Sequence, residues 1–281
     1  MSRTANVRTE LPLCTLWGVT FMAGTMSNFA AELLTHLASK SAKGASLWRV
    51  FTPNPEQLVM ARADADFRRA LEAAEWRIPD GIGVVWASRL LRRRGARACA
   101  ERVPGVEVVE ALLTASPQLT YLIIGGRDYA PPTDGVTGVS APVTEPITLR
   151  WRDAVVSWLP GYAQVSEPTA AEEQHVQRAL RALHPDVVFV ALGAPSQEHW
   201  VNAHQEVLAA AGVRLVMVVG GAFDMLFGKV PRASSFWRTI HAEWLYRLLR
   251  QPWRWRRQLR LFQFSWLVCL DWVRTFFVKN A

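Results

Sequence analysis

The sequence lacks the residue patterns that mark metal-dependent and dinucleotide-dependent enzymes. Its three cysteines have no CxxC spacing and its six histidines form neither an HExxH motif nor a close pair, so we expect no metal ion and no other cofactor. The segment Gly81-x-Gly83 lacks the third glycine of a dinucleotide-binding fingerprint, which argues against a dehydrogenase. No apolar signal peptide precedes the first predicted strand, and together with the few cysteines this predicts a reducing, cytoplasmic location.

A long uninterrupted apolar run is also missing. The most apolar stretch, Leu261 to Val278, contains Asp271 and Arg274 and is barely long enough to cross a bilayer. We therefore expect this segment to lie on a bilayer or to pack against the body of the protein.

Acidic residues are scarce only near the C-terminus. Residues 1–230 contain 22 basic and 22 acidic side chains, whereas residues 231–281 contain 10 basic and 2 acidic ones together with six tryptophans. Arginine mixed with tryptophan suits an anionic membrane surface, because each basic side chain near anionic lipid contributes about 1 kcal/mol and indole rings prefer the headgroup layer. Nucleic acid would also accept such a patch. We expect residues 236–281 to bind the inner face of the plasma membrane peripherally, and we expect no nucleic-acid partner.

Apolar runs rich in β-forming residues alternate with helical patterns along most of the chain. The predicted strands are 16–21, 47–51, 119–124, 155–159, 187–191 and 215–219, and the predicted helices are 28–38, 56–74, 82–91, 106–113, 170–183 and 197–211. Strands that are apolar throughout and separated by helices predict a parallel sheet that is covered on both faces. The predicted fold class is therefore α/β, with a Rossmann-like three-layer core around a mainly parallel sheet.

Composition divides the chain into three parts. We expect residues 1–13 to form a flexible tail, residues 14–235 the α/β core, and residues 236–281 a helical, membrane-associating appendage. Residues 128–150 interrupt the alternation with four prolines and two glycines, which predicts a long loop.

The segment Ile78-Pro79-Asp80-Gly81 holds one carboxylate between a proline and a glycine, just before a helical pattern. Pro79 fixes its own φ and Gly81 permits dihedrals closed to other residues, so this turn can place Asp80 at the mouth of a site as a general base. The alternative is that Asp80 caps the following helix by accepting hydrogen bonds from its first amides.

Four further segments follow in a characteristic order. They are Thr52-Pro53-Asn54-Pro55-Glu56, Glu101-Arg102-Val103-Pro104-Gly105, Ala194-Pro195-Ser196-Gln197-Glu198 and Gly220-Gly221-Ala222-Phe223-Asp224. Together with the Asp80 segment, they resemble the WecG/TagA/CpsF family of bacterial glycosyltransferases from about Leu16 to Arg257. The resemblance implies a fold of the GT-E type and the transfer of a hexose, of the N-acetylmannosamine type or glucose-like, from a UDP-sugar to a polyprenyl-diphosphate-linked sugar in cell-surface polysaccharide synthesis.

The resemblance also implies roles for four side chains. Asp80 would be the base that takes the proton from the acceptor hydroxyl in an inverting transfer. Thr52 and Asn54 would lie beside the donor, where a hydroxyl and an amide can form hydrogen bonds to the sugar or the diphosphate. A proline-fixed turn that opens the next helix is the alternative for this pair. Arg102 would bind the diphosphate, because a guanidinium matches two phosphate oxygens at once.

Other candidates for substrate binding lie where predicted strands end. They are Gly125, Gly126, Tyr162, Gln197, Gly220, Gly221 and Asp224. Bare glycine backbone permits the close approach of a nucleotide and its phosphates. Gln197 can donate to or accept from a sugar hydroxyl, although a glutamine at a helix start needs no ligand. Asp224 can accept from uracil or ribose, and an ordinary loop carboxylate is the alternative.

Three arginines of the appendage, Arg247, Arg254 and Arg257, reproduce the spacing of the arginines with which the family completes its active site when the appendage docks at the membrane. They lie on one helical face if a single helix continues through Pro252, whereas Pro252 can instead begin a second helix. The alternative is a lipid-contacting face with no catalytic part.

The tripeptide Asp64-Ala65-Asp66 matches the DxD motif with which metal-dependent glycosyltransferases hold a divalent ion. It falls inside the predicted helix 56–74, where neighbours two apart point about 200° away from each other and cannot face one ion. We therefore expect no metal there.

Two other functions stay open from the sequence. One is a nucleotide-sugar hydrolase or epimerase on the same core, and the other is a non-catalytic module that binds anionic lipid or nucleic acid. The oligomeric state is also open, with a homo-oligomer among the options.

Overall fold

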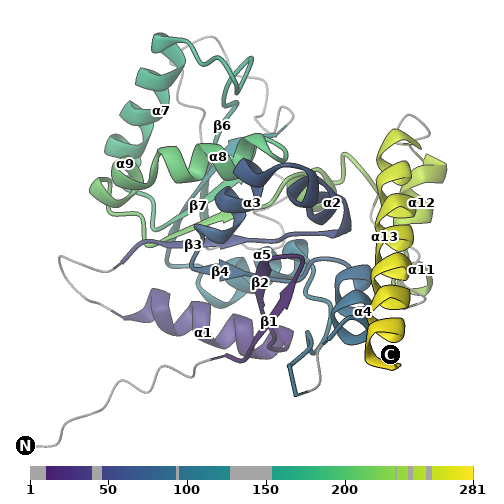
Figure 1. Cartoon of the computed structure of the whole chain (residues 1–281). Helices are drawn as coiled ribbons and strands as arrows, with labels where there is room; N and C mark the ends of the chain where they lie inside the picture. The colour runs from purple at the N-terminus through teal and green to yellow at the C-terminus, as the bar shows by residue number, and fades with distance from the viewer. Residues whose placement is uncertain are drawn as a thin grey trace, which may run out of the picture.

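A six-stranded sheet with helices on both faces forms the centre of the molecule (Figure 1). The structure, a computed structural model, describes residues 11–39, 46–92, 95–126, 154–231, 233–239, 243–250 and 255–280. The strand order is β4-β3-β8-β7-β5-β6, and each neighbouring pair is parallel. The predicted α/β class and three-layer core are therefore confirmed.

The order of the strands puts the last two at the centre of the sheet. The strands are β3 Trp48–Phe51, β4 Trp76–Arg77, β5 Thr120–Gly125, β6 Val155–Leu159, β7 Val187–Ala191 and β8 Leu215–Val218. β3 and β4 build one side, β5 and β6 build the other, and β7 and β8 fill the space between them. The sequence prediction missed β4 because two residues are too few to stand out as an apolar run.

The predicted strand 16–21 was wrong as a member of this sheet. Its residues belong to an antiparallel hairpin of β1 Leu13–Leu16 and β2 Val19–Met22, which forms a separate two-stranded sheet. Trp17 and Gly18 make the turn with φ of 53° and 80°. Because an apolar tryptophan occupies the first turn position, the run reads as continuous in the sequence.

Helices cover the two faces of the sheet in separate groups. The core helices are α1 Met26–Ala38, α2 Pro55–Ala63, α3 Ala65–Glu72, α4 Ile82–Leu90, α5 Gly105–Ala115, α7 Ala170–Leu183, α8 Ser196–Ala203, α9 Gln205–Ala210 and α10 Ala222–Leu226. α1 and α5 pack on one face, and α2, α3, α7 and α8 pack on the other (Figure 1). Adjacent strand residues alternate between the two cores, as Tyr121 and Leu122 do in β5.

Two predicted helices are each broken into two. The predicted helix 56–74 ends as α2 and restarts as α3 at Asp64, whose carboxylate accepts from the amides of Asp66 (2.8 Å) and Phe67 (3.1 Å). The predicted helix 197–211 breaks at His204, whose imidazole contacts the Trp200 carbonyl (2.9 Å) and Glu173 (2.9 Å). In both cases a side chain forms hydrogen bonds with the backbone or with a neighbouring polar group at the break. The helical pattern of the sequence does not show these hydrogen bonds.

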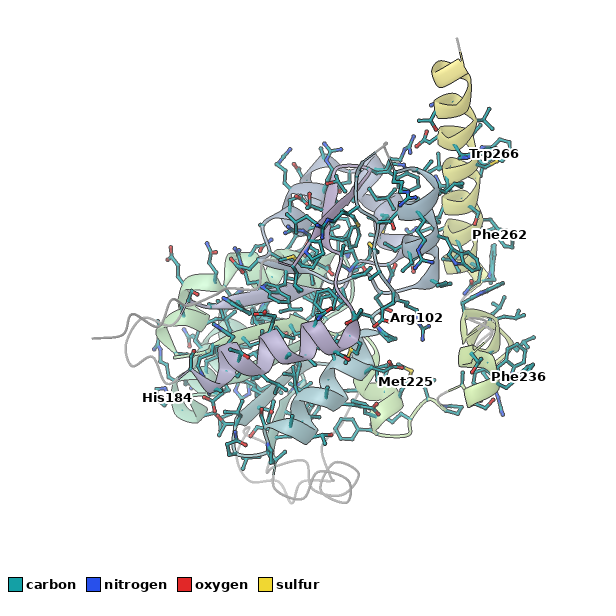
Figure 2. The ribbon with its side chains drawn as sticks, turned by 90° about the horizontal axis from the view of Figure 1, so that it is seen from below. Arg102, His184, Met225, Phe236, Phe262 and Trp266 are labelled. Atoms are coloured by element: carbon teal, nitrogen blue, oxygen red, sulfur yellow. The ribbon has the colours of Figure 1, made fainter. Side chains whose placement is uncertain are left out.

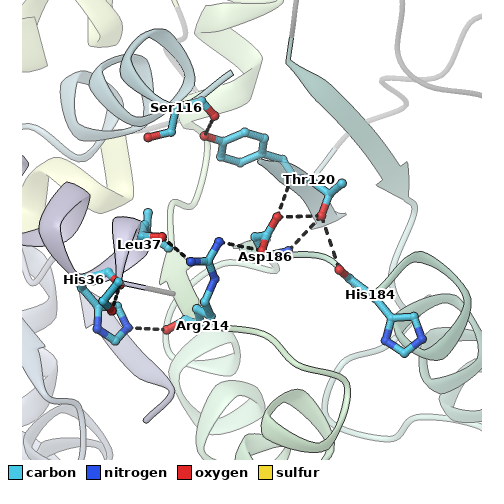
Figure 3. A network of polar contacts seen from close by, with 9 residues as sticks. His36, Leu37, Ser116, Thr120, His184, Asp186 and Arg214 are labelled. Atoms are coloured by element: carbon cyan, nitrogen blue, oxygen red, sulfur yellow. Dashed lines mark hydrogen bonds and ion pairs between the residues drawn. The ribbon is translucent and has the colours of Figure 1, made fainter. Parts of the chain in front are cut away.

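A polar network holds the starts of three strands together (Figure 3). Asp186, just before β7, accepts from the Thr120 amide at the start of β5 (2.9 Å) and from the guanidinium of Arg214 before β8 (2.7 Å). Arg214 also donates to the Leu37 carbonyl at the end of α1. These contacts tie the starts of β5, β7 and β8 together at the amino edge of the sheet, whereas open α/β sheets bind ligands at the opposite, carboxyl edge.

The C-terminal part is helical and packs against the core. Its helices are α11 Ser235–Thr239, α12 Glu243–Arg250 and α13 Trp255–Asn280. α13 lies along α2 and α4 (Figure 1), where it buries Phe264 and Val268. Its Asp271 accepts from Trp17 Nε1 (2.8 Å) and Arg62 Nη1 (2.5 Å), and the hydrogen bond from Arg62 lowers the pKa of Asp271.

No helix within the described ranges has both the length and the apolar character that crossing a membrane requires. The predicted loop at 128–150 and most of the predicted tail at 1–13 lie outside the described residues.

Candidate active site

The candidate residues of the core lie along the carboxyl edge of the sheet. Each of them follows the end of a strand or lies beside such a loop: Thr52 and Asn54 after β3, Asp80 after β4, Gly125 and Gly126 at β5, Tyr162 after β6, Gln197 after β7, and Gly220, Gly221 and Asp224 after β8. In a parallel sheet these loops all lie at one edge, where open α/β folds bind ligands. Asp224 lies in the short helix α10, so the alternative of an ordinary loop carboxylate does not describe it.

Backbone hydrogen bonds fix the Asp80 turn between two other motifs. The Asp80 amide donates to the Pro53 carbonyl (3.2 Å), and the Val103 amide donates to the Pro79 carbonyl (2.9 Å). The first bond joins the turn to the Thr52–Asn54 loop, and the second joins it to the segment that carries Arg102. Three motifs that are far apart in the sequence therefore meet at the backbone of this turn, in which Asp80 is half-buried.

Two glycines let proline and phenylalanine pack against this turn. Gly81 has φ of 119°, and a Cβ added there or at Gly83 would lie 3.0 Å from the Pro55 ring. A Cβ on Gly83 would also meet Phe264 of α13 at 3.4 Å. The N-cap of α4 is Gly81, so Asp80 lies one residue before the cap position that the alternative interpretation gave it.

Thr52 and Asn54 both have structural contacts. Asn54 is the N-cap of α2: its Oδ1 accepts from the Gln57 amide (3.0 Å), and its own amide donates to Gln57 Oε1 (3.1 Å). Thr52 is buried, with its hydroxyl 3.5 Å from the Val218 carbonyl, and a Cβ on Gly105 would lie 3.4 Å from its methyl group. The proline-fixed helix start is thus present. The groups that can still bind a ligand are the side-chain nitrogen Nδ2 of Asn54 and the hydroxyl of Thr52.

A buried carboxylate that the sequence analysis did not select lies beside this loop. Glu198 is fully buried, and its Oε1 accepts from Gln57 Nε2 (2.8 Å) and Gln197 Nε2 (2.9 Å). Burial raises the pKa of Glu198 to about 7. The only signal for Glu198 in the sequence was its position beside Gln197. Its other partner, Gln57, looks like an ordinary residue at the start of a helix and gave no sign of the contact.

A family model supplies the observation that decides the class of this protein. The model for the glycosyl transferase WecG/TagA/CpsF family matches residues 14–276. The chain belongs to this family. It is therefore a glycosyltransferase, and a non-catalytic binding module is set aside.

Two relatives agree with the family match. One, from Bacillus spizizenii, is 30% identical over 243 residues, which are 86% of this chain and 84% of the relative. The other, from Bacillus subtilis, is 28% identical over 247 residues, which are 88% and 87% of the two chains. Both carry the name N-acetylglucosaminyldiphosphoundecaprenol N-acetyl-beta-D-mannosaminyltransferase.

The glycine pairs of this family member differ in their surroundings. A Cβ on Gly125 would lie 2.7 Å from Leu192 and 2.9 Å from the Ala191 carbonyl, so packing between strand ends already requires that glycine. Gly220 has φ of 49° and open space on its Cβ side, and Gly221 faces only an oxygen of Asp224 at 3.3 Å. The loop after β8 is therefore the better place for a nucleotide to approach the backbone.

Tyr162 has a packing role in the structure. Its hydroxyl accepts from Trp200 Nε1 at 2.7 Å, and burial raises the pKa of the phenol. This contact lies after β6, at the outer side of the sheet, and Asp80 follows β4 at the other outer side. The structure does not bring Tyr162 and Asp80 together.

Arg102 lies on the side of the core that faces the C-terminal helices, and His184 lies at the opposite end (Figure 2). The predicted tail arginines are less fully described. Arg247 belongs to α12 and Arg257 to α13, with side chains outside the described part, and Arg254 is outside it altogether. α12 ends at Arg250 and α13 begins at Trp255, and residues 251–254 between them lie outside the described part, so a shared helical face for the three arginines stays a prediction.

The DxD tripeptide has contacts other than a metal site. Asp64 caps α3, and Asp66 pairs with Arg69 one turn along the same helix. Our reason for dismissing it, one continuous helix, was wrong, but the capping contact commits Asp64 to the backbone. Among the described residues, no group of three His, Cys, Asp or Glu side chains could hold a metal ion.

The buried Glu198 predicts a specific dependence of stability on pH. Its pKa is near 7 in the folded protein and 4.5 ordinarily, so the folded state binds the proton more tightly. The free energy of unfolding should fall as pH rises from about 4.5 to about 7, by up to about 3 kcal/mol. Urea denaturation at several pH values checks this against Glu198→Gln, which cannot ionise. The difference between the two proteins should change over that pH window, and parallel curves would contradict the assignment.

Proposed function

We propose that the protein transfers a hexose, of the N-acetylmannosamine type or glucose-like, from a UDP-sugar to a polyprenyl-diphosphate-linked sugar in cell-surface polysaccharide synthesis. The arrangement around Asp80 carries the proposal: one half-buried carboxylate at the carboxyl edge, hydrogen-bonded through its turn to the Thr52–Asn54 loop and to the Arg102 segment. The printed names of the two relatives support an N-acetylmannosaminyl group and a diphosphoundecaprenol-linked acceptor.

In the proposed reaction Asp80 takes the proton from the acceptor hydroxyl. The acceptor oxygen attacks the anomeric carbon from the side opposite UDP, so the configuration inverts while the bond to UDP breaks. UDP leaves with the electron pair of that bond, and Arg102 offsets the charge on its diphosphate, with Arg247, Arg254 and Arg257 joining it from the appendage. The Thr52 hydroxyl and the Asn54 amide bind the donor, and Gly220 and Gly221 leave room for the nucleotide. No metal ion takes part.

We also propose that α13 binds the membrane surface peripherally. Exposed apolar side chains follow each other along α13 at intervals of three, four or seven residues, which places them on one face: Trp255, Leu259, Phe262, Trp266 and Val273. Phe262 is 67% and Trp266 64% exposed, and both project away from the core (Figure 2). An apolar stripe in a basic, tryptophan-rich helix suits the boundary between headgroups and acyl chains, where a lipid-linked acceptor would be found.

Replacing the proposed base tests the mechanism directly. Asp80→Asn should keep the fold and the binding of UDP but lower the rate of transfer by about 10²-fold or more, since the base is lost and the shape is kept. The assay follows transfer to a polyprenyl-diphosphate-sugar acceptor by mass spectrometry, with UDP binding measured by calorimetry. Asp66→Asn is the matched control, because it removes an exposed carboxylate of the DxD tripeptide and should leave transfer unchanged. An unchanged rate in Asp80→Asn would refute the role of Asp80.

Chelation tests the metal-independent step. Because no group of three His, Cys, Asp or Glu side chains within the described ranges could hold a divalent ion, EDTA should leave the rate of transfer unchanged. Loss of transfer with EDTA and its recovery with Mg²⁺ or Mn²⁺ would show that the proposal is wrong on this point. Turnover of the UDP-sugar without any acceptor would instead favour a hydrolase.

Removing the apolar stripe tests the membrane contact. The double change Phe262→Ser and Trp266→Ser should reduce co-sedimentation with anionic vesicles about tenfold or more, since two large apolar side chains would no longer be buried in lipid. UDP binding should not change. Gln263→Ser, an exposed change on the same helix outside the stripe, is the control. Full vesicle binding by the double variant, with loss of self-association instead, would make the stripe an interface between copies of the chain.

A further inference from the structure

One buried carboxylate joins two loops that the sheet keeps apart. β3 and β7 are not neighbours, because β8 lies between them. Gln57 belongs to α2, which follows β3, and Gln197 and Glu198 belong to α8, which follows β7. Glu198 Oε1 accepts from Gln57 Nε2 at 2.8 Å and from Gln197 Nε2 at 2.9 Å. A single oxygen therefore ties the start of α2 to the start of α8 across the end of β8.

The bond to Gln57 continues to the turn that carries Asn54. Gln57 uses its side-chain nitrogen for Glu198 and its side-chain oxygen for the Asn54 amide (3.1 Å). The Gln57 backbone amide in turn donates to Asn54 Oδ1 (3.0 Å). Because both ends of the Gln57 amide are bonded, its orientation is fixed, and the Asn54 turn is fixed with it.

The bond to Gln197 determines what that side chain can offer to a ligand. Its nitrogen is committed to Glu198, which leaves its oxygen as an acceptor. Among the described residues, neither Gln197 Oε1 nor Glu198 Oε2 has a hydrogen-bond partner, although both atoms are buried. A buried acceptor without a partner is unfavourable, so an O–H or N–H brought to Gln197 would offset that cost.

We propose that Glu198 is a positioning residue for the donor sugar. It acts through its two amide partners: it holds the Asn54 turn in place, and it turns Gln197 so that a carbonyl oxygen meets a hydroxyl or an acetamido N–H of the sugar. Glu198 needs no contact of its own with the substrate, because it acts through Gln57 and Gln197. This inference rests on the proposed function, since it assigns a role within donor binding.

Two substitutions at Glu198 separate positioning from stability. Glu198→Ala removes both hydrogen bonds and should raise KM for the UDP-sugar about tenfold or more, while kcat changes less than about threefold, since the loss falls on donor binding. Glu198→Gln keeps an oxygen that accepts from both amides, so it should restore KM to within about threefold of the unchanged protein. Steady-state kinetics at a fixed acceptor concentration and calorimetry with UDP-sugar give the measurements.

A carboxylate at the other edge of the same sheet is the matched control. Asp186→Asn weakens the network of Figure 3 and should lower the melting temperature without changing KM. If Glu198→Ala behaves in the same way, with lower stability and an unchanged KM, the inference is overturned and Glu198 is structural only. Gln57→Ala provides the same test if Glu198→Ala does not fold: a raised KM supports the inference, and an unchanged KM overturns it.

Failure of the inference differs from failure of the proposed function. Absence of UDP binding by the unchanged protein would overturn both. Normal UDP-sugar binding by the unchanged protein and by Glu198→Ala would overturn only the inference.

Discussion

Parallel pairing of the strands is the constraint on which the rest of this structure depends. Every strand of the large sheet runs in the same direction, so the chain leaves each of them at the same edge. At the opposite edge, Asp186 accepts from the Thr120 amide and from Arg214 and so joins the starts of β5, β7 and β8. Motifs separated by more than a hundred residues lie at the same edge of the sheet because of the direction and the order of the strands that precede them.

At the carboxyl edge, the contacts that stabilise the fold also position the proposed catalytic carboxylate. The Asp80 turn donates to the Pro53 carbonyl and accepts from the Val103 amide, and a Cβ on Gly81 or Gly83 would lie only 3.0 Å from the Pro55 ring. Phe264 of α13 lies against Gly83, three residues after Asp80, so the C-terminal helix is part of the surroundings of Asp80. A change that loosens this packing would therefore disturb the carboxylate as well as the fold.

The sequence predicted the parts of the fold that depend on local pattern. β6, β7 and α7 agree with prediction to the residue, because short, largely apolar runs and a helical pattern mark them. The hairpin turn at Trp17 and the helix breaks at Asp64 and His204 were missed, since each depends on a side chain whose partners are not visible in a periodic pattern.

For the candidate site, too, local motifs were predictable from the sequence and contacts between distant residues were not. Its motifs were found because they stand at predicted strand ends, and the edge follows from the fold. The contact between Gln57 and Glu198 joins residues that lie 141 positions apart, and only the sheet order makes them neighbours. The sequence likewise does not show whether a given carboxylate is buried, so the sequence analysis treated Glu198 as an ordinary residue at the start of a helix.

The attachment of α13 has a consequence for the geometry of any reaction at a bilayer. Phe264 against Gly83 and Asp271 against Trp17 and Arg62 attach the helix to the core at two levels along its length. If the apolar stripe of α13 rests on lipid as proposed, the carboxylate of Asp80 stands at a constant height above the headgroups. The distance between Asp80 and the membrane surface would then select the acceptor: only a sugar whose hydroxyl extends from its lipid anchor to the height of Asp80 could react.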